Sequence, residues 1–387
     1  AHAAESRYRD RKIGTISEAT CFSLYATKNI AAGEGGLIST NSGEVAGAID
    51  DLRIMRRATG SLYDVAVPGY KANLSDVLAA IALVQLDKLD EYLALQDDGL
   101  NTIQLDIKDE NGEVGFIPSA VPLAMRVGAA KPYCRPRAVA RLLEQRGIYL
   151  IGRVVVFEDP RLAEGAPHLA LKTRDGSVWR TRTGLAWSNP YDRRVWDYNV
   201  SLAEVAARAG FDEIQFDYVR FPSDGDLSLI RYPGPRPQSM AWTIPAFVQY
   251  AARRLHPLGV RVSVDVFGLS ATRDLGIGQL PRRISSYVDA VYPMVYPSHY
   301  NSGEYGLPDP DAVPGRTVTH SLLDFQTALE GRTTRLTPWL QDFSLGRTYT
   351  LDDVRAQIAA ARALHTHGFL LWNAEGQYDA PALLPPA

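Results

Sequence analysis

The sequence predicts an α/β fold, a (β/α)8 TIM barrel with an N-terminal appendage and loop insertions at the C-terminal mouth. Three observations predict it. From about residue 87 onward, seven short segments are apolar or alternate between apolar and polar residues, as strands do. Segments with apolar residues three and four apart, as in helices, separate them. The chain of 387 residues is also long enough for a barrel, which commonly takes about 250 residues as one unit.

The alternation of strands and helices predicts a parallel sheet, because parallel neighbours need a long crossover. The predicted strands are residues 102–108, 148–156, 213–218, 260–267, 290–296, 336–341 and 368–373. The predicted helices include residues 137–145, 202–209, 244–255 and 354–363. A helix is also expected over residues 86–95, and the eighth strand, first in chain order, over residues 61–67. The Pro- and Gly-rich stretch 232–237 is expected to lie over the functional mouth as an insertion.

Residues 1–60 fit the barrel pattern poorly. Gly33, Gly35, Gly36 and Gly43 lie among Ser, Thr and Asn residues, and a charged run follows at residues 53–57. We therefore expect a partly irregular appendage over residues 1–60 and the barrel over residues 61–387.

Composition excludes several classes of protein. Lys and Arg number 41 against 44 Asp and Glu, a net charge of -3, which leaves no surplus for binding nucleic acid. The most apolar run, residues 77–86, is far shorter than the ~18 residues that a membrane helix needs. Two cysteines, Cys21 and Cys134, allow one disulfide at most and no four-thiolate zinc site. The chain starts at Ala1 without a methionine, from which we expect a secreted or envelope-associated protein.

Polar side chains alternate with apolar ones along three of the predicted strands. In strand 260–267, valines alternate with Arg261, Ser263 and Asp265. Strands 102–108 and 213–218 follow the same rule, so the polar set, Lys108 included, is expected to face the lumen. Barrel interiors are normally filled with branched aliphatics, and an unpaired buried polar group costs about 1–3 kcal/mol, so a wet or ligand-lined mouth is expected.

Three carboxylates, Asp106, Asp217 and Asp265, stand at or near the C-terminal ends of their strands, where barrel active sites are built. Asp217 and Asp265 lie on the fourth and fifth strands, which are neighbours about 4.8 Å apart. Carboxyl groups about 5 Å apart are typical of a retaining glycosidase, whereas an inverting enzyme separates them by about 6.5–9.5 Å. The alternative is that each aspartate caps a helix or pairs with an arginine such as Arg153 or Arg220.

Aromatic and amide groups follow the ends of the remaining strands. They are Tyr292, Tyr296, His299, Tyr300, Trp339, Gln341, Asp342, Trp372 and Asn373. Flat rings beside hydrogen-bonding groups suit a sugar, which has apolar C–H faces and a rim of hydroxyls. The alternative for Trp339 and Trp372 is a place in the core.

Other chemistries lack their signatures. No G-x-S-x-G elbow, P-loop or dinucleotide-binding glycine motif stands between a predicted strand and a helix. His365 and His367 have the look of a metal pair, but they precede strand 368–373 at the N-terminal end of the barrel, so we expect them to be structural. We expect no metal and no cofactor.

Several strings occur in one order along residues 87–380. They are QLDIKD at 104–109, GRVVVFEDP at 152–160, VWDYN at 195–199, GFDEIQFDYVRFP at 210–222, VDVFG at 264–268, PMVYPSHY at 293–300, PWLQDF at 338–343 and LWNA at 371–374. Together they closely resemble the putative glycosyl hydrolase domain family of bacterial proteins, which is placed among α-amylase-like (β/α)8 barrels. The resemblance implies a carbohydrate-active barrel, often exported or envelope-associated.

The resemblance also implies roles for two residues. In α-amylase-like enzymes the nucleophile is an Asp ending strand four and the acid/base a carboxylate ending strand five, the places of Asp217 and Asp265. The acid/base there is usually Glu, whereas this chain has Asp. The α-amylase motif also has an Arg two residues before the nucleophile, where this chain has Gln215, so Arg153 or Arg220 is expected to supply that charge.

The sequence therefore predicts a glycoside hydrolase that cleaves glycosidic bonds of a polysaccharide or oligosaccharide with retention, with Asp217 as nucleophile and Asp265 as acid/base. The predicted substrate-binding residues are Asp106, Lys108, Arg153, Arg220, Tyr296, His299, Trp339, Gln341, Asp342, Trp372, Asn373 and Glu375. Asp342 and Glu375 are the next candidates for the acid/base. The alternatives are a non-catalytic carbohydrate-binding barrel of the cell envelope and, third, a metal-dependent deacetylase or amidohydrolase.

Overall fold

The structure is a computed structural model, which describes residues 7–9, 11–24, 35–54, 69–70, 72 and 100–383. The chain divides into two compact units, Ala1–Leu100 and Asn101–Ala387. The predicted strand over residues 61–67, the predicted helix over residues 86–95 and the expected boundary at residue 60 all lie outside the described residues.

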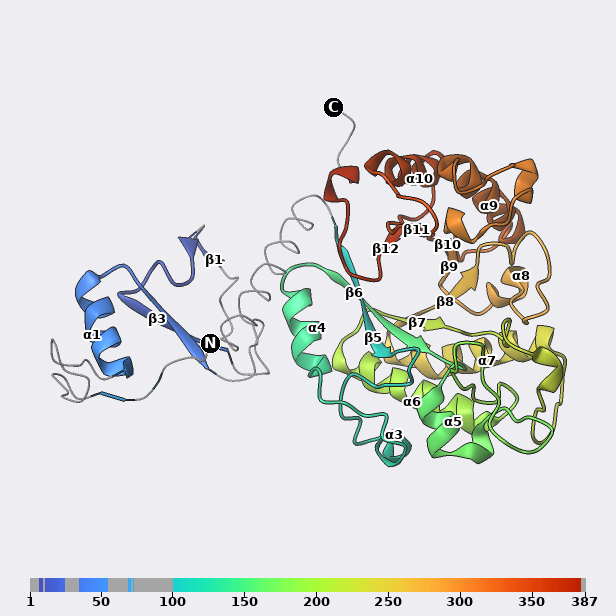
Figure 1. The fold of residues 1–387 in the computed structure, drawn as a ribbon, viewed down its shortest axis with the longest axis horizontal. Coiled ribbons are helices and arrows are strands. Elements are labelled where there is room, and N and C mark those ends of the chain that lie inside the picture. The colour runs from blue at the N-terminus through green and yellow to red at the C-terminus, as the bar shows by residue number, and fades with distance from the viewer. Residues whose placement is uncertain are drawn as a thin grey trace. The chain divides into compact units, whose positions relative to one another are not determined.

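The described part of the first unit consists of short antiparallel strand pairs and one helix. Strand β1 (Arg7–Tyr8) pairs with β2 (Arg11–Lys12), and β3 (Ala19–Ser23) pairs with β4 (Gly36–Thr40). Helix α1 (Gly43–Ile54) follows β4 (Figure 1). These antiparallel pairs do not continue the strand–helix alternation of the second unit.

The second unit is built on a curled parallel sheet with the strand order β12-β11-β9-β8-β7-β6-β5, and β10 pairs with β9 (Figure 1). The strands are β5 (Thr102–Lys108), β6 (Tyr149–Val155), β7 (Glu213–Asp217), β8 (Arg261–Phe267), β9 (Ala290–Met294), β10 (Arg335–Leu336), β11 (Trp339–Gln341) and β12 (Leu370–Trp372). All the strands predicted between residues 102 and 373 are confirmed, and the segment 336–341 is divided into β10 and β11.

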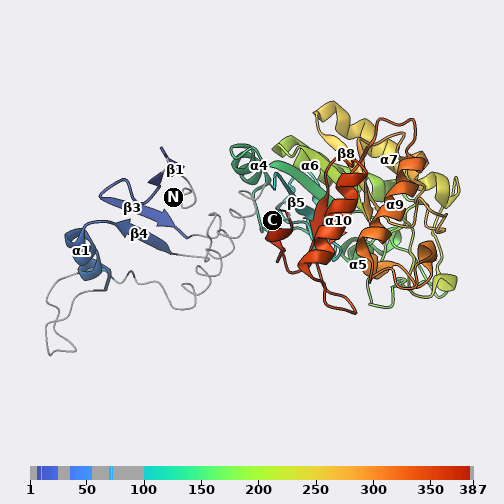
Figure 2. The same cartoon turned by 90° about the horizontal axis from the view of Figure 1, so that it is seen from above.

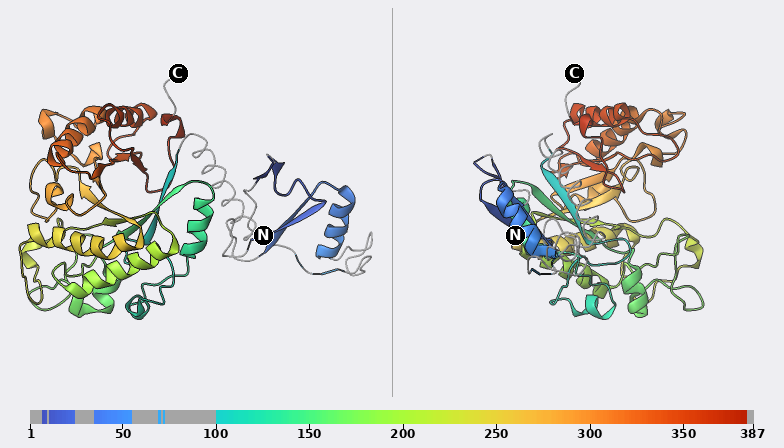
Figure 3. Two further views of the ribbon diagram at one scale, coloured as in Figure 1. Left: turned by 180° about the vertical axis from the view of Figure 1, so that it is seen from behind. Right: turned by 60° about the vertical axis from the view of Figure 1, so that its left-hand side comes forward.

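Helices surround this sheet (Figure 2). They are α3 (Pro122–Arg126), α4 (Pro136–Glu144), α5 (Pro160–Gly165), α6 (Arg193–Ala209), α7 (Met240–Leu255), α8 (Pro281–Ile284), α9 (Pro314–Ala328) and α10 (Leu351–Ala363). The helices predicted over residues 137–145, 202–209, 244–255 and 354–363 are confirmed as α4, α6, α7 and α10. Neighbouring helices pack in pairs, α6 beside α7 and α9 beside α10 (Figure 3).

Local sequence signals set the ends of the long helices. Asp192 caps the start of α6, where its side chain accepts a hydrogen bond from the backbone N–H of Arg194. Gly210 ends the same helix with φ 105, a left-handed conformation that glycine adopts at little cost. A capping box of Thr350 and Asp353 starts α10. The helix α6 begins nine residues earlier than expected, because its first turns carry polar residues that hide the apolar period.

The polar residues of β7 face the lumen, as the sequence predicts. Phe216 packs edge-on against Phe247 of α7, with ring centroids 5.4 Å apart, and so faces the helices. Because side chains alternate along a strand, Gln215 and Asp217 face the opposite side. Both are buried, which places a polar layer inside the barrel.

One strand departs from the expected alternation. Asp106 pairs with Arg153, but Lys108 pairs with Val154, so β5 advances two residues where β6 advances one. This β-bulge turns Lys108 to the side of Val154, away from the lumen. Lys108 forms a fully buried ion pair with Asp159 and lies over the ring of Tyr198, with its amino nitrogen 5.3 Å from the ring centroid. The expectation that Lys108 faces the lumen is therefore wrong.

Within the described residues the sheet ends at β5 and β12 and fills seven of the eight positions of a (β/α)8 barrel. The segment 61–67, which is expected to form the remaining strand, lies outside the described ranges. No helix in the part of the chain that the structure describes is long and apolar enough to cross a membrane.

Candidate active site

A cavity of about 430 Å³ opens at the C-terminal ends of the barrel strands. Asp217 and Met294 are the last residues of β7 and β9, and both line it. The remaining lining residues are Gln104, Arg153, Tyr218, Arg220, Asp265, Phe267, Gly268, Leu269, Leu275, Tyr296, His299, Tyr300, Trp339 and Trp372. Barrel enzymes place their active sites at this end of the strands, so this cavity is the candidate active site.

Both carboxylate oxygens of Asp217 accept hydrogen bonds. Oδ2 accepts from Nε and Nη2 of Arg153 at 2.9 and 2.8 Å. Oδ1 accepts from the backbone N–H of Tyr218 at 2.6 Å. Tyr218 has φ 47, a left-handed conformation that is rare for a bulky residue and that concentrates at functional sites. The carboxylate of Asp217 thus accepts three hydrogen bonds, two of them from a guanidinium.

Arg153 is held by further acids on the outer side of the cavity. Its Nη1 donates to Oδ1 of Asp106 at 2.9 Å and to Oε2 of Glu110 at 3.4 Å. The pKa of Arg153 rises well above its ordinary value, because the charges of Asp217 and Asp106 outweigh the opposing effect of burial. Asp106 is itself half-exposed and does not line the cavity, so it acts on the site through Arg153.

Asp265 lies beside Asp217 on the neighbouring strand. The residues directly before them, Phe216 and Val264, are register partners in the pairing of β7 with β8. Asp265 is buried, and its Oδ1 accepts a hydrogen bond from Nε1 of Trp339 at 2.7 Å. Burial first, and the charge of Asp217 second, raise the pKa of Asp265 well above its usual range. The two neighbouring carboxyls thus differ in environment: Asp217 accepts bonds from a guanidinium and a backbone N–H, whereas burial favours the protonated form of Asp265.

Aromatic rings form the wall of the cavity around these carboxyls. Trp339 and Trp372 meet edge to face with ring centroids 6.1 Å apart. Tyr296 and His299 meet at 5.4 Å. Burial lowers the pKa of His299, which favours the neutral imidazole near pH 7. Trp339 is buried, as the core alternative expects, yet its indole N–H reaches Asp265 and its ring lines the cavity.

The absence of a side chain at Gly268 lets Tyr300 reach the cavity. A Cβ at Gly268 would collide with the hydroxyl of Tyr300 and would come within 2.8 Å of the carbonyl oxygen of Met294. The hydroxyl of Tyr300 instead donates to Oγ of Ser321, which donates to the carbonyl of Gly268. The Val264–Gly268 string therefore ends in glycine because two chain segments meet there.

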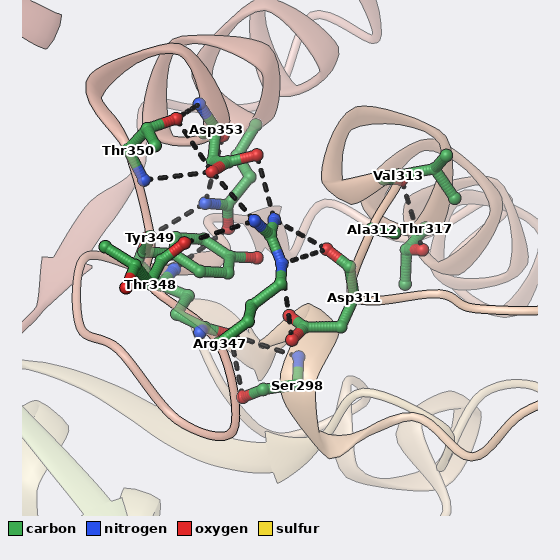
Figure 4. Close-up of polar contacts among 12 residues, drawn as sticks. Ser298, Asp311, Ala312, Val313, Thr317, Arg347, Thr348, Tyr349, Thr350 and Asp353 are labelled. Atoms are coloured by element: carbon green, nitrogen blue, oxygen red, sulfur yellow. Dashed lines mark hydrogen bonds and ion pairs between the residues drawn. The ribbon is translucent and has the colours of Figure 1, made fainter.

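A hydrogen-bond network joins the loop after β9 to the loop after β11 (Figure 4). Nη2 of Arg347 donates to the backbone oxygen of Asp311 and to Oδ1 of Asp353, both at 2.8 Å. Asp311 precedes α9, and Asp353 belongs to the capping box of α10. The network fixes the starts of both helices relative to each other.

Eight of the residues predicted for the site line the cavity. They are Asp217, Asp265, Arg153, Arg220, Tyr296, His299, Trp339 and Trp372. Asp217 does pair with an arginine, as one alternative expected, but that arginine lines the same cavity. Asp265 caps no helix and accepts from Trp339 instead.

Six of the residues predicted for the site do not line the cavity: Asp106, whose bond to Arg153 is described above, Lys108, Gln341, Asp342, Asn373 and Glu375. Lys108 is turned outward by the β-bulge described above. The buried amide of Gln341 is used inside the fold, because its Oε1 accepts from the backbone N–H and Oγ of Ser298 and its Nε2 donates to Phe343. Gln341 thus holds the turn that carries His299.

The loops after β11 and β12 bond to each other and take the remaining three residues away from the cavity. Oδ2 of Asp342 accepts from the backbone N–H of Asp379 at 3.0 Å, and Nδ2 of Asn373 donates to the backbone oxygen of Asp342. Oδ1 of Asn373 accepts from the backbone N–H of Glu375 at 2.8 Å. Burial raises the pKa of Asp342 to about 6, yet neither Asp342 nor Glu375 is placed to act as the acid/base.

Sequence reasoning missed several residues of the cavity wall. Tyr218 and Phe267 each follow a predicted catalytic aspartate within two residues, and this proximity was a usable signal. Gln104 belongs to the polar face of β5 and points into the cavity, where its amide donates to Gln215. Leu269 and Leu275 lie in the loop after β8 and carry no pattern that would have identified them.

Metal ligands do not gather at this site. No cluster of three or more His, Cys, Asp or Glu side chains able to hold a metal is present among the described residues. His367 lies near β10, where its Nδ1 accepts from the backbone N–H of Leu336 at 3.4 Å. Cys21 and Cys134 are both exposed free thiols and belong to different units.

Comparison with known proteins matches two overlapping parts of the chain to different families. Residues 1–130 match the DegT/DnrJ/EryC1/StrS aminotransferase family. The spore coat polysaccharide biosynthesis protein SpsC of Bacillus subtilis is 46% identical over 101 residues, which is 24% of this chain and 26% of SpsC. An uncharacterised protein of Methanocaldococcus jannaschii is 45% identical over 98 residues, 23% of this chain and 25% of its own. The chain thus spans about a quarter of the length of the curated relatives that it matches.

The glycoside hydrolase domain of PgaB (BpsB) from Bordetella bronchiseptica has a similar fold. It covers 79% of this chain and 93% of its own, with a TM-score of 0.55 at 14% identity. A hypothetical protein from Ruminiclostridium thermocellum is 35% identical and covers 46% of this chain and 91% of its own, with a TM-score of 0.42. Residues 78–378, well over half of the chain, match the putative glycosyl hydrolase domain family, and the chain belongs to that family.

Proposed function

We propose that the barrel is a retaining glycosidase that cleaves glycosidic bonds of a polysaccharide, with Asp217 as nucleophile and Asp265 as acid/base. The observation that carries the proposal is the opposite environment of two neighbouring carboxyls in one cavity. Asp217 accepts hydrogen bonds from the guanidinium of Arg153 and the backbone N–H of Tyr218, whereas burial favours the protonated form of Asp265. Neighbouring strands lie about 4.8 Å apart, close to the separation of about 5–5.5 Å found in retaining enzymes.

In the first step, a carboxylate oxygen of Asp217 attacks the anomeric carbon, and the bond from that carbon to the leaving oxygen breaks. Asp265 gives its proton to the leaving oxygen and becomes a carboxylate. In the second step, Asp265 takes a proton from water, and the water oxygen displaces Asp217 from the anomeric carbon. Both residues then have their starting protonation states.

The aromatic wall would hold the sugar during these steps. Trp372 is exposed and lines the cavity, so its ring offers an apolar surface to the C–H face of a sugar. The neutral imidazole of His299 offers a donor and an acceptor to sugar hydroxyls. With a polysaccharide as substrate, we further propose that the protein acts outside the cell or at the cell envelope, where such polymers are met.

Two aspartates at strand ends provide a matched test. Asp217→Asn and Asp265→Asn remove the proposed roles, whereas Asp342→Asn changes an aspartate at the end of β11 that does not line the cavity. The measurement is sugar release from a panel of bacterial and fungal polysaccharides that includes amino-sugar and α-linked polymers. We expect release by the native protein and by Asp342→Asn, and loss of at least about 1,000-fold in Asp217→Asn.

Undiminished release by Asp217→Asn would contradict the proposed nucleophile. The competing function is a carbohydrate-binding barrel that holds a polymer without cutting it. No release from any polymer, together with equal binding by the native protein and all three variants, would favour that function instead.

A further inference from the structure

Arg220 is a second cation of the cavity, and it is set among aromatic rings. The side chain is buried and lines the cavity beside Asp217. Its guanidinium carbon lies 5.0 Å from the ring centroid of Trp187, 4.9 Å from that of Tyr218 and 4.8 Å from that of Phe267. Aromatic faces stabilise a cation within about 6 Å and leave its N–H edges free to donate.

Few of the N–H groups of Arg220 are used within the fold. Nη1 donates to the backbone oxygen of Phe221 and to Oγ of Ser223, both at 3.1 Å. Among the described residues, Nε and Nη2 of Arg220 donate to no protein atom. Neither nitrogen is among the polar atoms that are buried without a hydrogen-bond partner, so both have access to the cavity.

The charge of Arg220 is also unpaired in the part of the chain that the structure describes. Glu158, Asp217 and Asp224 are close enough to feel its charge, but none lies within ion-pair distance. Arg153, by contrast, is bonded to three acids. Burial raises the pKa of Glu158 to about 7, which leaves this neighbour partly neutral near pH 7. Arg220 is therefore the cation of the cavity that remains available to a ligand.

The bonds of Nη1 and the aromatic rings replace only part of the hydration that the buried guanidinium of Arg220 loses, and a ligand anion at Nε and Nη2 would replace more of it. We propose that the sugar bound in this cavity carries a carboxylate, as a uronic acid does, and that Nε and Nη2 of Arg220 bind it. The planar fork of two adjacent N–H groups matches the two oxygens of a carboxylate. The inference rests on the proposed glycosidase function, because it names the substrate class of the same cavity.

The first test needs no variant. Hydrolysis of a polyuronic acid is compared with that of the same polymer after reduction of its carboxylates to primary alcohols, for galacturonate- and glucuronate-containing polymers. We expect kcat/KM for at least one carboxylated polymer to exceed that for its reduced form by about 10- to 100-fold, the range of a charge-assisted hydrogen bond in a buried site. Equal or better hydrolysis of every reduced form would overturn the inference and leave the glycosidase function standing.

The second test separates Arg220 from its surroundings. Arg220→Gln removes the charge, Arg220→Lys keeps the charge without the fork, and Ser223→Ala removes only a hydrogen bond that holds Nη1. We expect both Arg220 variants to abolish the preference for the carboxylated polymer, and Ser223→Ala to retain it. If Arg220→Gln still prefers the carboxylated polymer, another residue binds the carboxylate, and the inference is overturned.

Binding tests the inference independently of hydrolysis. The probes are sodium D-galacturonate and D-glucuronate against D-galactose and D-glucose, titrated into the native protein and observed by ligand NMR. We expect the native protein to bind an acid at least about tenfold more tightly than its neutral partner. In Arg220→Gln we expect the acid to bind no more tightly than the neutral sugar. Equal binding of acid and neutral sugar would contradict the inference, whereas selective binding without hydrolysis of any polymer would contradict only the glycosidase function.

Discussion

The guanidinium of Arg153 contacts Oδ2 of Asp217 through two nitrogens, Nε at 2.9 Å and Nη2 at 2.8 Å. The α-amylase pattern has an arginine two residues before the nucleophile, and this chain has Gln215 there. The charge comes instead from the neighbouring strand β6, since Arg153 and Gln215 are register partners. Of the two arginines expected to supply this charge, Arg153 makes the contact, and Arg220 lies over aromatic rings.

Replacing Arg153 tests this relationship. Arg153→Lys keeps a positive charge but cannot make two parallel bonds to one carboxylate, so we expect kcat/KM to fall by about 10- to 100-fold. Arg153→Gln should cost more, because it leaves Asp217 and Asp106 without a cation. Steady-state kinetics on the best polymer measures both. Activity of Arg153→Gln within about twofold of the native protein would show that Asp217 works without this arginine.

The pH dependence of kcat/KM tests the role of Asp265. Because burial and Asp217 raise its pKa, Asp265 keeps its proton at pH values where an ordinary carboxyl, with a pKa of about 3.9, has lost it. A proton donor is lost as the pH rises through that raised pKa, so activity should fall on the alkaline side. We expect the alkaline limb well above the ordinary value. An alkaline limb at about pH 4 would contradict the assignment.

A matched pair of substrates separates acid catalysis from other effects of Asp265. Asp265→Asn should lose hydrolysis of natural glycosides but still release the aryl group of an aryl glycoside in a first turnover, because that leaving group needs no proton. Equal loss on both substrates would mean that the variant disturbs more than proton transfer.

Glu158 makes stability depend on pH. Its pKa is raised from 4.5 to about 7 by burial, which outweighs the charge of Arg220. The folded state binds this proton more tightly than the unfolded state does. The contribution of Glu158 to the free energy of unfolding is therefore fully present below about pH 4.5 and is lost as the pH rises through 7. Glu158→Gln should therefore be more stable than the native protein at pH 9 by about 2 kcal/mol and similar to it at pH 4.5.

Urea unfolding at the two pH values measures this difference. The control is Glu164→Gln, which changes a half-exposed glutamate that pairs with Arg180 on the surface. The control should show no such gain at pH 9. The same gain in both variants would assign the effect to overall charge rather than to the burial of Glu158.

The buried pair of Lys108 and Asp159 predicts a large effect on stability. Asp159→Asn leaves the Lys108 ammonium buried without an anion, and removing one partner of a buried pair costs about 3–5 kcal/mol. Asp226→Asn is the control, because Asp226 also caps a short helix but is exposed. Denaturant midpoints measure both. Similar, small changes in the two variants would contradict the account of Lys108 as a buried ion.

Much of the barrel could be predicted because apolar and polar residues alternate regularly along its strands. The alternation in β7 and β8 identified Asp217 and Asp265 as strand-end residues of one face, and the structure puts both in the cavity. Arg153 was expected only as one of two arginines that could pair with these aspartates, and the pairing of β6 with β7 puts it beside Asp217. Periodicity is a local property of the chain, so one sequence is enough to detect it.

The errors arise where contacts between distant segments decide. The amino-acid sequence of residues 102–108 contains no signal for the β-bulge that turns Lys108 toward Asp159. Gln341 looks like a free amide at a strand end, but its bond to Ser298 depends on how the loop after β9 folds. The bond that Asp342 accepts from the backbone N–H of Asp379 likewise depends on how a loop folds. Such loop contacts join residues far apart in sequence, and no local pattern encodes them.

The central claim is that Asp217 forms a covalent bond to the sugar, while Asp265 donates a proton to the leaving oxygen and then accepts one from water. The most direct measurement uses Asp265→Asn with an aryl glycoside of the sugar that the native protein releases, followed by acid quenching and peptide mass mapping. Because the base for the second step is missing, the account predicts that the peptide containing Asp217 gains the mass of one glycosyl unit. Release of the aryl group with no adduct on that peptide, or an adduct on another residue, would contradict it.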